Sequence, residues 1–175
     1  RIAYAEHPED NLDKLLSGLM DMTYPIGGYR RFMIYDHKER EICAAPFSDR
    51  VLHHAIMNVC GPYFERFLID DSYASCKGKG QVRAVRRACE YAGRYRWFMK
   101  CDIRRYFDSI SHILLYDRLV RKFKDPFLLK WFEKLISSYE KTPGTGLPIG
   151  NLTSQYFANL YLDGVDRIHA PYVRY

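Results

Sequence analysis

A chain of 175 residues with 47% hydrophobic and 15% aromatic side chains can bury the core of one domain, which argues against a disordered polypeptide. Its five cysteines form no CxxC pair or Cys/His cluster, and we recognise no signal peptide or membrane span, so we expect a cytoplasmic protein with reduced thiols, no zinc and no membrane partner. The net charge of +6 is concentrated in residues 77–105, where ten Lys or Arg and two acidic residues give +8.

Hydrophobic periodicity and turn residues define the elements along the chain. In chain order we expect a helix from Asp10 or Asn11 to Gly27-Gly28, a β-hairpin with strands at 29–36 and 41–47, a helix from Ser48 to a break at Gly61-Pro62, a loop at 70–80, a helix at 81–93, a strand at 96–103, helices from about Ser111 and from Asp125-Pro126, a turn at 142–150, a helix at 151–163 and a C-terminal strand. This order predicts an α+β fold, with a sheet that carries the chemistry and helices behind it.

The basic segment has two interpretations. Basic residues on an amphipathic helix at 81–93 are most often a solvated face, with Val82, Val85 and Cys89 turned inward. The sharper interpretation is a track for a polyanion, because each contact with a phosphate adds salt-dependent affinity. The residues of this track are Lys77, Lys79, Arg83, Arg86 and Arg87.

A carboxylate stands near the end of the strand predicted at 96–103. Alternation places Asp102 on the face opposite Met99 and Cys101. Aspartate is common where a strand turns into a loop, so this position alone has a structural explanation. Arg104, Arg105 and the basic segment nearby suggest instead a phosphoryl-transfer site, which needs carboxylates for Mg²⁺ and cations for phosphates. Asp108 is a rival that would lie at the start of a helix.

The segment FMKCDIRRYFDSI at 98–110 resembles motif A of reverse transcriptases, and GLPIGNLTSQYFANLYLD at 146–163 resembles their motif B. The hairpin and the loop SYASCKGKG at 72–80 are similar to the fingers of the bacterial branch of that family, which includes group II intron, retron and diversity-generating retroelement enzymes. The resemblance runs from about residue 12 to the end of the chain. The form IGNLTSQ at 149–155 is most similar to the diversity-generating retroelement group.

This resemblance implies an RNA-directed DNA polymerase with the fold of a right hand, in which an antiparallel palm sheet is backed by helices. Fingers would occupy residues 1–95 and a partial palm residues 96–175. The implied ligands are two Mg²⁺ ions in the complete enzyme, an RNA template, a DNA or RNA primer and dNTPs. The implied partner is an accessory protein of the retroelement.

Carried over by position, the resemblance also implies roles for single residues. Asp102 would be the catalytic metal ligand, joined by the backbone carbonyl of Ile103. Phe107 would be the steric gate against the sugar. The nucleotide would further be met by Lys38, Arg40, Arg105, Ile149, Gly150 and Gln155, and the template-primer backbone by Lys77, Lys79, Arg83, Arg86 and Arg87.

The same resemblance suggests why two glycines and a proline occur in the bend at 146–150. Gly146 and Gly150 would allow the backbone to approach a ligand closely, while Pro148 stiffens the turn. Asn151, Ser154 and Gln155 would then face the nascent base pair. A glycine-rich entry to a core helix remains the alternative, and we favour it for the packed side chains of Tyr156, Phe157, Leu160 and Tyr161.

Two features depart from the pattern of the family. Tyr175 is expected to be the tyrosine of the third motif, Tyr-x-Asp-Asp, so both aspartates and the thumb would lie outside residues 1–175. We therefore expect these residues alone not to polymerise. Ile149 stands where many relatives carry Gln, so a hydrogen bond to the nucleotide would be absent, which suggests error-prone copying.

Two other functions remain open at the level of sequence. One is a reverse-transcriptase-like polymerase of phage defence that adds nucleotides without a template. The other is a non-catalytic scaffold that binds nucleic acid through the basic segment. Omission of the template from an extension assay separates the first from a reverse transcriptase, and binding without extension identifies the second.

Overall fold

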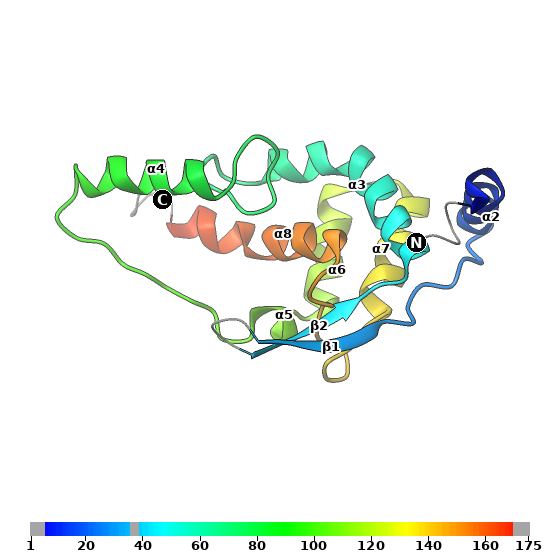
Figure 1. The fold of residues 1–175 in the computed structure, drawn as a ribbon. Coiled ribbons are helices and arrows are strands. Elements are labelled where there is room, and N and C mark those ends of the chain that lie inside the picture. Colours follow the sequence, from blue (N-terminus) through cyan, green and yellow to red (C-terminus); the bar gives the residue numbers. More distant parts are fainter. Residues whose placement is uncertain (1–5, 36–38, 170–175) are drawn as a thin grey trace.

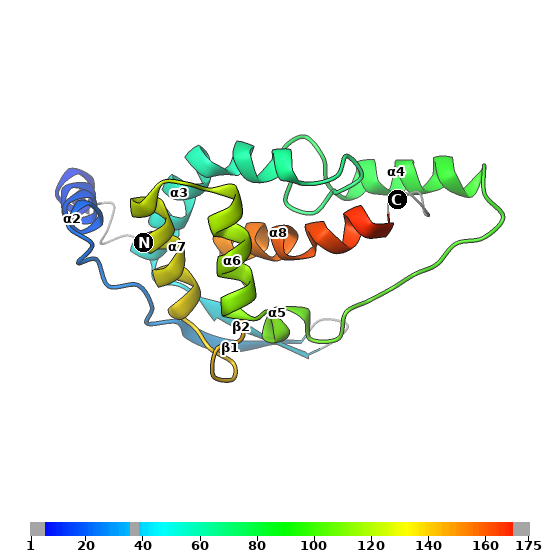
Figure 2. The same cartoon turned by 180° about the vertical axis from the view of Figure 1, so that it is seen from behind.

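The computed structural model describes residues 6–35 and 39–169, and it is a helical fold with a small antiparallel sheet. Helices α3 (Phe47–Phe67) and α8 (Leu152–His169) lie side by side in both views (Figures 1 and 2). Helices α6 (His112–Lys122) and α7 (Pro126–Ser137) pack across one end of this pair, and α2 (Pro8–Met20) lies beyond α7. The mixture of helices and a small sheet agrees with the predicted α+β class.

The predicted hairpin is confirmed. Strand β1 (Arg30–Tyr35) pairs antiparallel with β2 (Glu39–Ala44), in a register that sets Arg31 opposite Cys43 and Ile34 opposite Arg40. Every residue of β1 is exposed, whereas Cys43 of β2 is buried. The hairpin is therefore held to the domain through β2, and one face of β1 remains open to solvent.

Two helix starts follow the expected capping chemistry. The Ser111 hydroxyl, at the N-cap of α6, accepts a hydrogen bond from the Leu114 N–H. The Asp125 carboxylate accepts one from the Leu128 N–H at 2.8 Å, and Pro126 occupies the first turn of α7. Side-chain acceptors satisfy backbone donors that a helix start otherwise leaves unpaired.

The break predicted at Gly61-Pro62 is wrong, because α3 continues through both residues to Phe67. Pro62 removes one backbone donor, but the flanking residues Cys60, Gly61 and Phe64 are buried and packing holds the helix together. A Cβ built at Gly61 would lie 3.2 Å from the Tyr156 hydroxyl of α8. This glycine therefore permits close contact between two helices instead of ending one.

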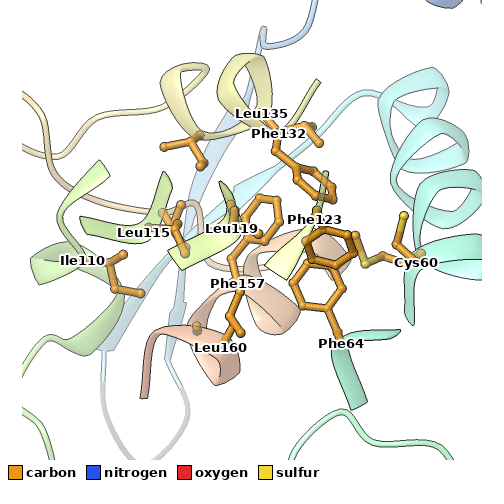
Figure 3. Packing of buried hydrophobic residues seen from close by; sticks show 14 residues of the cluster. Cys60, Phe64, Ile110, Leu115, Leu119, Phe123, Phe132, Leu135, Phe157 and Leu160 are labelled. Atoms are coloured by element: carbon orange, nitrogen blue, oxygen red, sulfur yellow. The ribbon is translucent and has the colours of Figure 1, made fainter. Parts of the chain in front are cut away.

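The core lies where α3, α6, α7 and α8 meet. Figure 3 shows Phe64, Phe123, Phe132 and Phe157 gathered there, and the ring centroids of Phe64 and Phe123 are 4.9 Å apart. Aliphatic side chains from α6 and α8 fill the space between these rings, among them Leu115. Burial on this scale fixes the start of α8, and with it the bend that precedes this helix.

The strand predicted at 96–103 is not observed. Residues 94–103 run as an extended, exposed segment from the end of α4 (Gln81–Ala92) toward the short helix α5 (Tyr106–Ser109) (Figures 1 and 2). Trp97 and Phe98 are 90% and 94% exposed. A strand needs a neighbour for its ladder of hydrogen bonds, and the C-terminal strand expected to provide one, at about 171–175, lies outside the described residues.

The inward face predicted for residues 81–93 is also wrong. Helix α4 has no buried residue, and Val82 and Val85 are 77% and 55% exposed. The helix extends beyond the far ends of α3 and α8, where it has few neighbours in the part of the chain that the structure describes (Figure 1). Cys101 is exposed as well.

Candidate functional site

The bend before α8 joins the hairpin to the end of the motif A segment. The Cys43 N–H of β2 donates to the Ile149 carbonyl at 3.0 Å. On the other side of the bend, the Leu147 N–H donates to the Phe107 carbonyl and the Gly146 N–H to the Ile110 carbonyl, each at 2.9 Å. Three segments that are distant in sequence thus meet through backbone hydrogen bonds at one place.

The glycines of this bend are required by geometry. Gly146 has φ of +109°, and a Cβ there would lie 2.8 Å from the Lys141 backbone nitrogen. Gly150 has φ of +118°, and its Cβ would meet Ile42 of β2 at 3.4 Å. Residues other than glycine rarely adopt such positive φ angles. The close approach shown here is between the bend and its own neighbours, which supports the helix-entry interpretation of these residues.

A histidine fixes the outer side of the same bend. The His112 Nε2 atom lies 2.8 Å from the Gly146 carbonyl oxygen, and the His112 N–H donates to the Gly144 carbonyl at 3.0 Å. The Glu140 carboxylate lies 3.9 Å from the Nδ1 atom of the same ring. The contacts of His112 with the turn join residues that are distant in sequence, so its position could not be predicted from local sequence.

The motif A residues lie just before α5. Asp102, Ile103 and Arg105 are exposed, and Asp102 has no hydrogen bond or ion pair with other described residues. Arg105 adopts a left-handed conformation with φ of 49° and forms the N-cap of α5. Phe107 follows within α5, half-buried against the core, and its carbonyl is the one bonded to the bend.

The two hairpin residues predicted to meet a nucleotide have different outcomes. Lys38 lies outside the described residues. The backbone of Arg40 is part of β2 and pairs with Ile34. Their contact with a nucleotide stays a prediction.

The helix after the bend corrects one expectation. Asn151 and Ser154 are each 2% exposed, so they do not face a base pair. Gln155 is exposed, and its Oε1 atom accepts a hydrogen bond from the Ser75 hydroxyl at 2.7 Å. Phe157 and Leu160 are buried, as the packing interpretation predicted.

The loop at 70–80 is attached to three helices. The Asn159 amide of α8 donates to the Ala74 carbonyl at 2.7 Å, and the Lys77 N–H donates to Glu65 of α3 at 2.9 Å. Toward α4, Arg87 donates to the Asp71 carboxylate at 3.0 Å. The loop therefore links α4, which carries the basic residues, to the start of α8.

The predicted basic track is only partly free to meet a phosphate. Arg87 pairs with Asp71 and Glu90 and stacks on Tyr91, with its Cζ atom 4.5 Å from the ring centroid. These two carboxylates raise the pKa of Arg87 above its usual value. Arg86 has no such partner in the described parts of the chain. The groove between loop and helix, about 820 Å³, is lined by Asp70, Asp71, Tyr73, Lys79, Arg83, Arg86, Arg87 and Glu90.

A second pocket involves residues that sequence reasoning left out. It has a volume of about 220 Å³ and is lined by Arg50, His53, His54, Gly150, Leu152 and Gln155. Gly150 and Gln155 were predicted to meet a ligand, whereas Arg50, His53 and His54 of α3 were not among the predicted site residues. His53 is 2% exposed, and its spacing in the sequence gave no sign that it would lie against the bend.

The described residues offer few ligands for a metal. Asp102 is a single exposed carboxylate beside the Ile103 carbonyl, and within 6–35 and 39–169 no group of three His, Cys, Asp or Glu side chains could hold an ion. Mg²⁺ is commonly held by one or two carboxylates together with substrate phosphates. The residues present therefore fit one ion shared with a nucleotide, and they do not by themselves fit a two-metal site.

Among the described helices, none combines the length and the hydrophobicity that a membrane span requires.

Comparisons with known proteins give two groups of relatives. No family model matches the sequence. Among curated proteins, the chain is 27% identical over 169 residues to group II intron-encoded protein LtrA of Lactococcus lactis subsp. cremoris, a match that covers 91% of this chain and 28% of LtrA. It is 25% identical over 95 residues to the mitochondrial nuclear intron maturase 1 of Arabidopsis thaliana, which covers 54% of this chain and 13% of that protein.

A solved structure agrees with the curated relatives. The chain superposes on a chain of a partial Cas6-RT-Cas1–Cas2 complex with a TM-score of 0.57 and 27% identity, over 93% of this chain and 30% of the other. The chain thus spans less than a third of the length of each protein named here. Likeness to intron-encoded proteins and to an RT chain, over most of the sequence, supports a reverse transcriptase as the general class of this protein.

Proposed function

We propose that the chain is the fingers and partial palm of an RNA-directed DNA polymerase that extends a primer with dNTPs on an RNA template. The observation that carries the proposal is the junction at 146–150. Its backbone bonds join β2 of the proposed fingers to the Phe107 end of the motif A segment in the proposed palm. In a polymerase, that junction would form one wall of the nucleotide site.

The chemistry assigned to the site is nucleotidyl transfer. The 3′-hydroxyl of the primer attacks the α-phosphorus of a dNTP, a new phosphodiester bond forms, and pyrophosphate leaves as the bond between the α- and β-phosphates breaks. Asp102 and the Ile103 carbonyl would hold Mg²⁺, which neutralises charge on the triphosphate. Arg105, Lys38 and Arg40 would meet the same phosphates, and Phe107 would lie against the sugar.

The proposed subtype is a diversity-generating retroelement enzyme that copies with frequent errors, working with an accessory protein. The pattern at 149–155 supports it, because Ile149 cannot donate or accept a hydrogen bond where an amide would. The solved RT chain also occurs in an assembly with Cas proteins. We further propose that residues 1–175 alone are inactive, because the described residues supply one carboxylate where two ions are needed.

Primer extension on an RNA template tests the function. A longer chain that includes the third motif and a thumb should extend the primer only when template and dNTPs are both present. Asp102→Asn in that chain should lower the rate by about 10³-fold or more, because a neutral amide holds Mg²⁺ poorly. Asp117→Asn is the matched control, since Asp117 lies on the exposed side of α6, paired with Arg121.

The outcomes separate the candidates. Extension that survives Asp102→Asn and is lost in Asp108→Asn would transfer the metal role to Asp108 and overturn our assignment. Extension without template would identify a template-independent polymerase. Binding of nucleic acid without any extension would identify a scaffold.

A further inference from the structure

A pocket between α3 and the start of α8 has the properties of a phosphate site. Arg50 and His54 of α3 line it on one side, and Gly150, Leu152 and Gln155 line it on the other. Arg50 and His54 are exposed, so a ligand can reach them from solvent. The pocket adjoins the bend that we assign to the nucleotide site, because Gly150 belongs to both.

The only side chain with a fixed charge among the described residues that line this pocket is Arg50. The nearby buried carboxylate of Asp49, whose charge acts on His53, accepts hydrogen bonds from the Tyr24 hydroxyl and the Gly27 N–H. None of the residues that line the pocket is acidic, and Arg50 has no carboxylate within salt-bridge distance in the described parts of the chain. Its guanidinium rests over the Phe47 ring, with the Cζ atom 5.4 Å from the centroid, which leaves its hydrogen-bond donors available. The groove beside α4 differs, because three carboxylates there engage or face the cations.

His53, which lines the same pocket, has a buried ring nitrogen without a partner among the described residues. Its Nδ1 atom lies 2.7 Å from the Thr153 hydroxyl, whereas Nε2 has no hydrogen-bond partner in the described part of the chain. Burial lowers the pKa of His53 to about 4, so its ring is neutral near pH 7. When Thr153 donates to Nδ1, the proton of the ring is on Nε2, which can then donate to an oxygen. An unpaired buried donor is costly, and a ligand oxygen would satisfy it.

The start of α8 adds a third source of positive potential. Helix α8 has 18 residues and begins at Leu152, which lines the pocket. Asn151 precedes it and lies near the Tyr29 hydroxyl, and within 6–35 and 39–169 its buried Oδ1 atom accepts no hydrogen bond from the first turn, so this side chain does not cap the helix. The N-terminus of a helix attracts anions through its dipole and its unpaired amides.

From these observations we propose that the pocket formed by Arg50, His53 and the N-terminus of α8 binds a phosphate group. The source of that phosphate rests on the proposed function: it belongs either to the backbone of a nucleic-acid strand passing the bend or to a nucleotide. A strand phosphate fits better with the exposed position of Arg50. Arg50 would position the strand, and His53 would fix one oxygen.

Binding measurements with the unmodified chain and two variants test this proposal. Fluorescence anisotropy with a labelled oligouridylate at several salt concentrations gives affinity and salt slope, and competition with dTTP gives the affinity for a nucleotide. Arg50→Gln should weaken oligouridylate binding several-fold and lower the salt slope by about 0.7, the loss of one contact on a single strand. Arg66→Gln is the matched control, an exposed arginine on the same helix that lies over Tyr63 and outside the pocket.

Each outcome has one meaning. Weaker oligouridylate binding with unchanged dTTP binding places a strand phosphate in the pocket, and the reverse result places a nucleotide phosphate there. Equal behaviour of Arg50→Gln and Arg66→Gln with both probes overturns the proposal. Because these assays require no catalysis, failure of primer extension would remove the proposed function and leave the phosphate site standing.

Nuclear magnetic resonance of the imidazole nitrogens provides an independent readout. Addition of inorganic phosphate should shift the Nε2 resonance of His53. The Nε2 resonance of His112 should stay in place, because that atom already contacts the Gly146 carbonyl oxygen. Equal shifts of both histidines, or none in His53, would contradict a phosphate at this position.

Discussion

At the scale of single residues, the candidate site consists of side chains whose chemistry follows from their residue type. Which residues they contact is determined by the fold. Asp102 was predicted as a carboxylate at a strand end, and it is exposed just before α5. His53 is packed in the core, yet among the described residues its Nε2 atom lacks a hydrogen-bond partner, and the residue lines the pocket that contains Arg50. The chemistry of a residue can be recognised from the sequence, whereas its neighbours in space are determined by the packing of the fold.

The first prediction at this scale concerns fidelity. Ile149→Gln, in a chain that polymerises, should lower misincorporation by about tenfold, which corresponds to about 1.4 kcal/mol of added discrimination. The reason is that an amide can hydrogen-bond a correctly placed nucleotide, whereas an isoleucine side chain cannot. Sequencing of the cDNA product measures the error rate. Ile113→Gln, at an exposed position on α6, is the control, and an unchanged error spectrum in Ile149→Gln would count against our assignment.

At the scale of elements, the bend before α8 is the part most sensitive to small changes. Gly146→Ala should lower the free energy of unfolding by about 2–4 kcal/mol, because it combines an unfavourable φ with a 2.8 Å approach to the Lys141 backbone. Gly144→Ala should cost about 1–2 kcal/mol, since its φ is +72° but the space around it is open. Urea unfolding measures both variants, and equal losses would show that the close approach does not matter.

The elements themselves divide into those that local sequence determines and those that it does not. The starts of α6 and α7 were predictable because Ser111 and Asp125 satisfy local backbone donors. The passage of α3 through Pro62 was not, because it depends on contact with Tyr156, far along the chain. For the same reason, Asn151 and Ser154 could be recognised as polar residues of a helix start but not as buried ones.

At the scale of the whole molecule, the main feature is that the tertiary contacts of the described residues are concentrated at one end. That end holds the aromatic core, while α4 extends away from it and residues 94–103 run back toward α5 with apolar side chains exposed (Figure 1). The sequence predicted a strand at 96–103 from its alternation alone. Alternation of apolar and polar residues indicates that a segment can form a strand. A strand also needs a neighbouring strand to pair with, and the described residues do not provide one for residues 96–103.

The two tryptophans report on this arrangement. Trp97 is 90% exposed and Trp131 is 3% exposed. In single-tryptophan variants, Trp131→Phe should leave red-shifted emission that acrylamide quenches efficiently, whereas Trp97→Phe should leave emission that acrylamide quenches weakly. In a longer chain in which residues 94–103 pair with a further strand, the emission of Trp97 should move to the blue. Equal quenching of both variants of the 175-residue chain would show that residues 94–103 are covered.

The hydrogen bond between Cys43 and Ile149 has a mechanical consequence. Because a Cβ at Gly150 would already lie 3.4 Å from the Ile42 side chain, the bend lies close to strand β2, and we expect the two to move together about the buried Cys43. A tilt of the hairpin would then pull on the Ile149 carbonyl and on the first turn of α8. If the hairpin belongs to fingers and α8 to a palm, as we propose, closure of the fingers would move the start of α8 through backbone contacts alone.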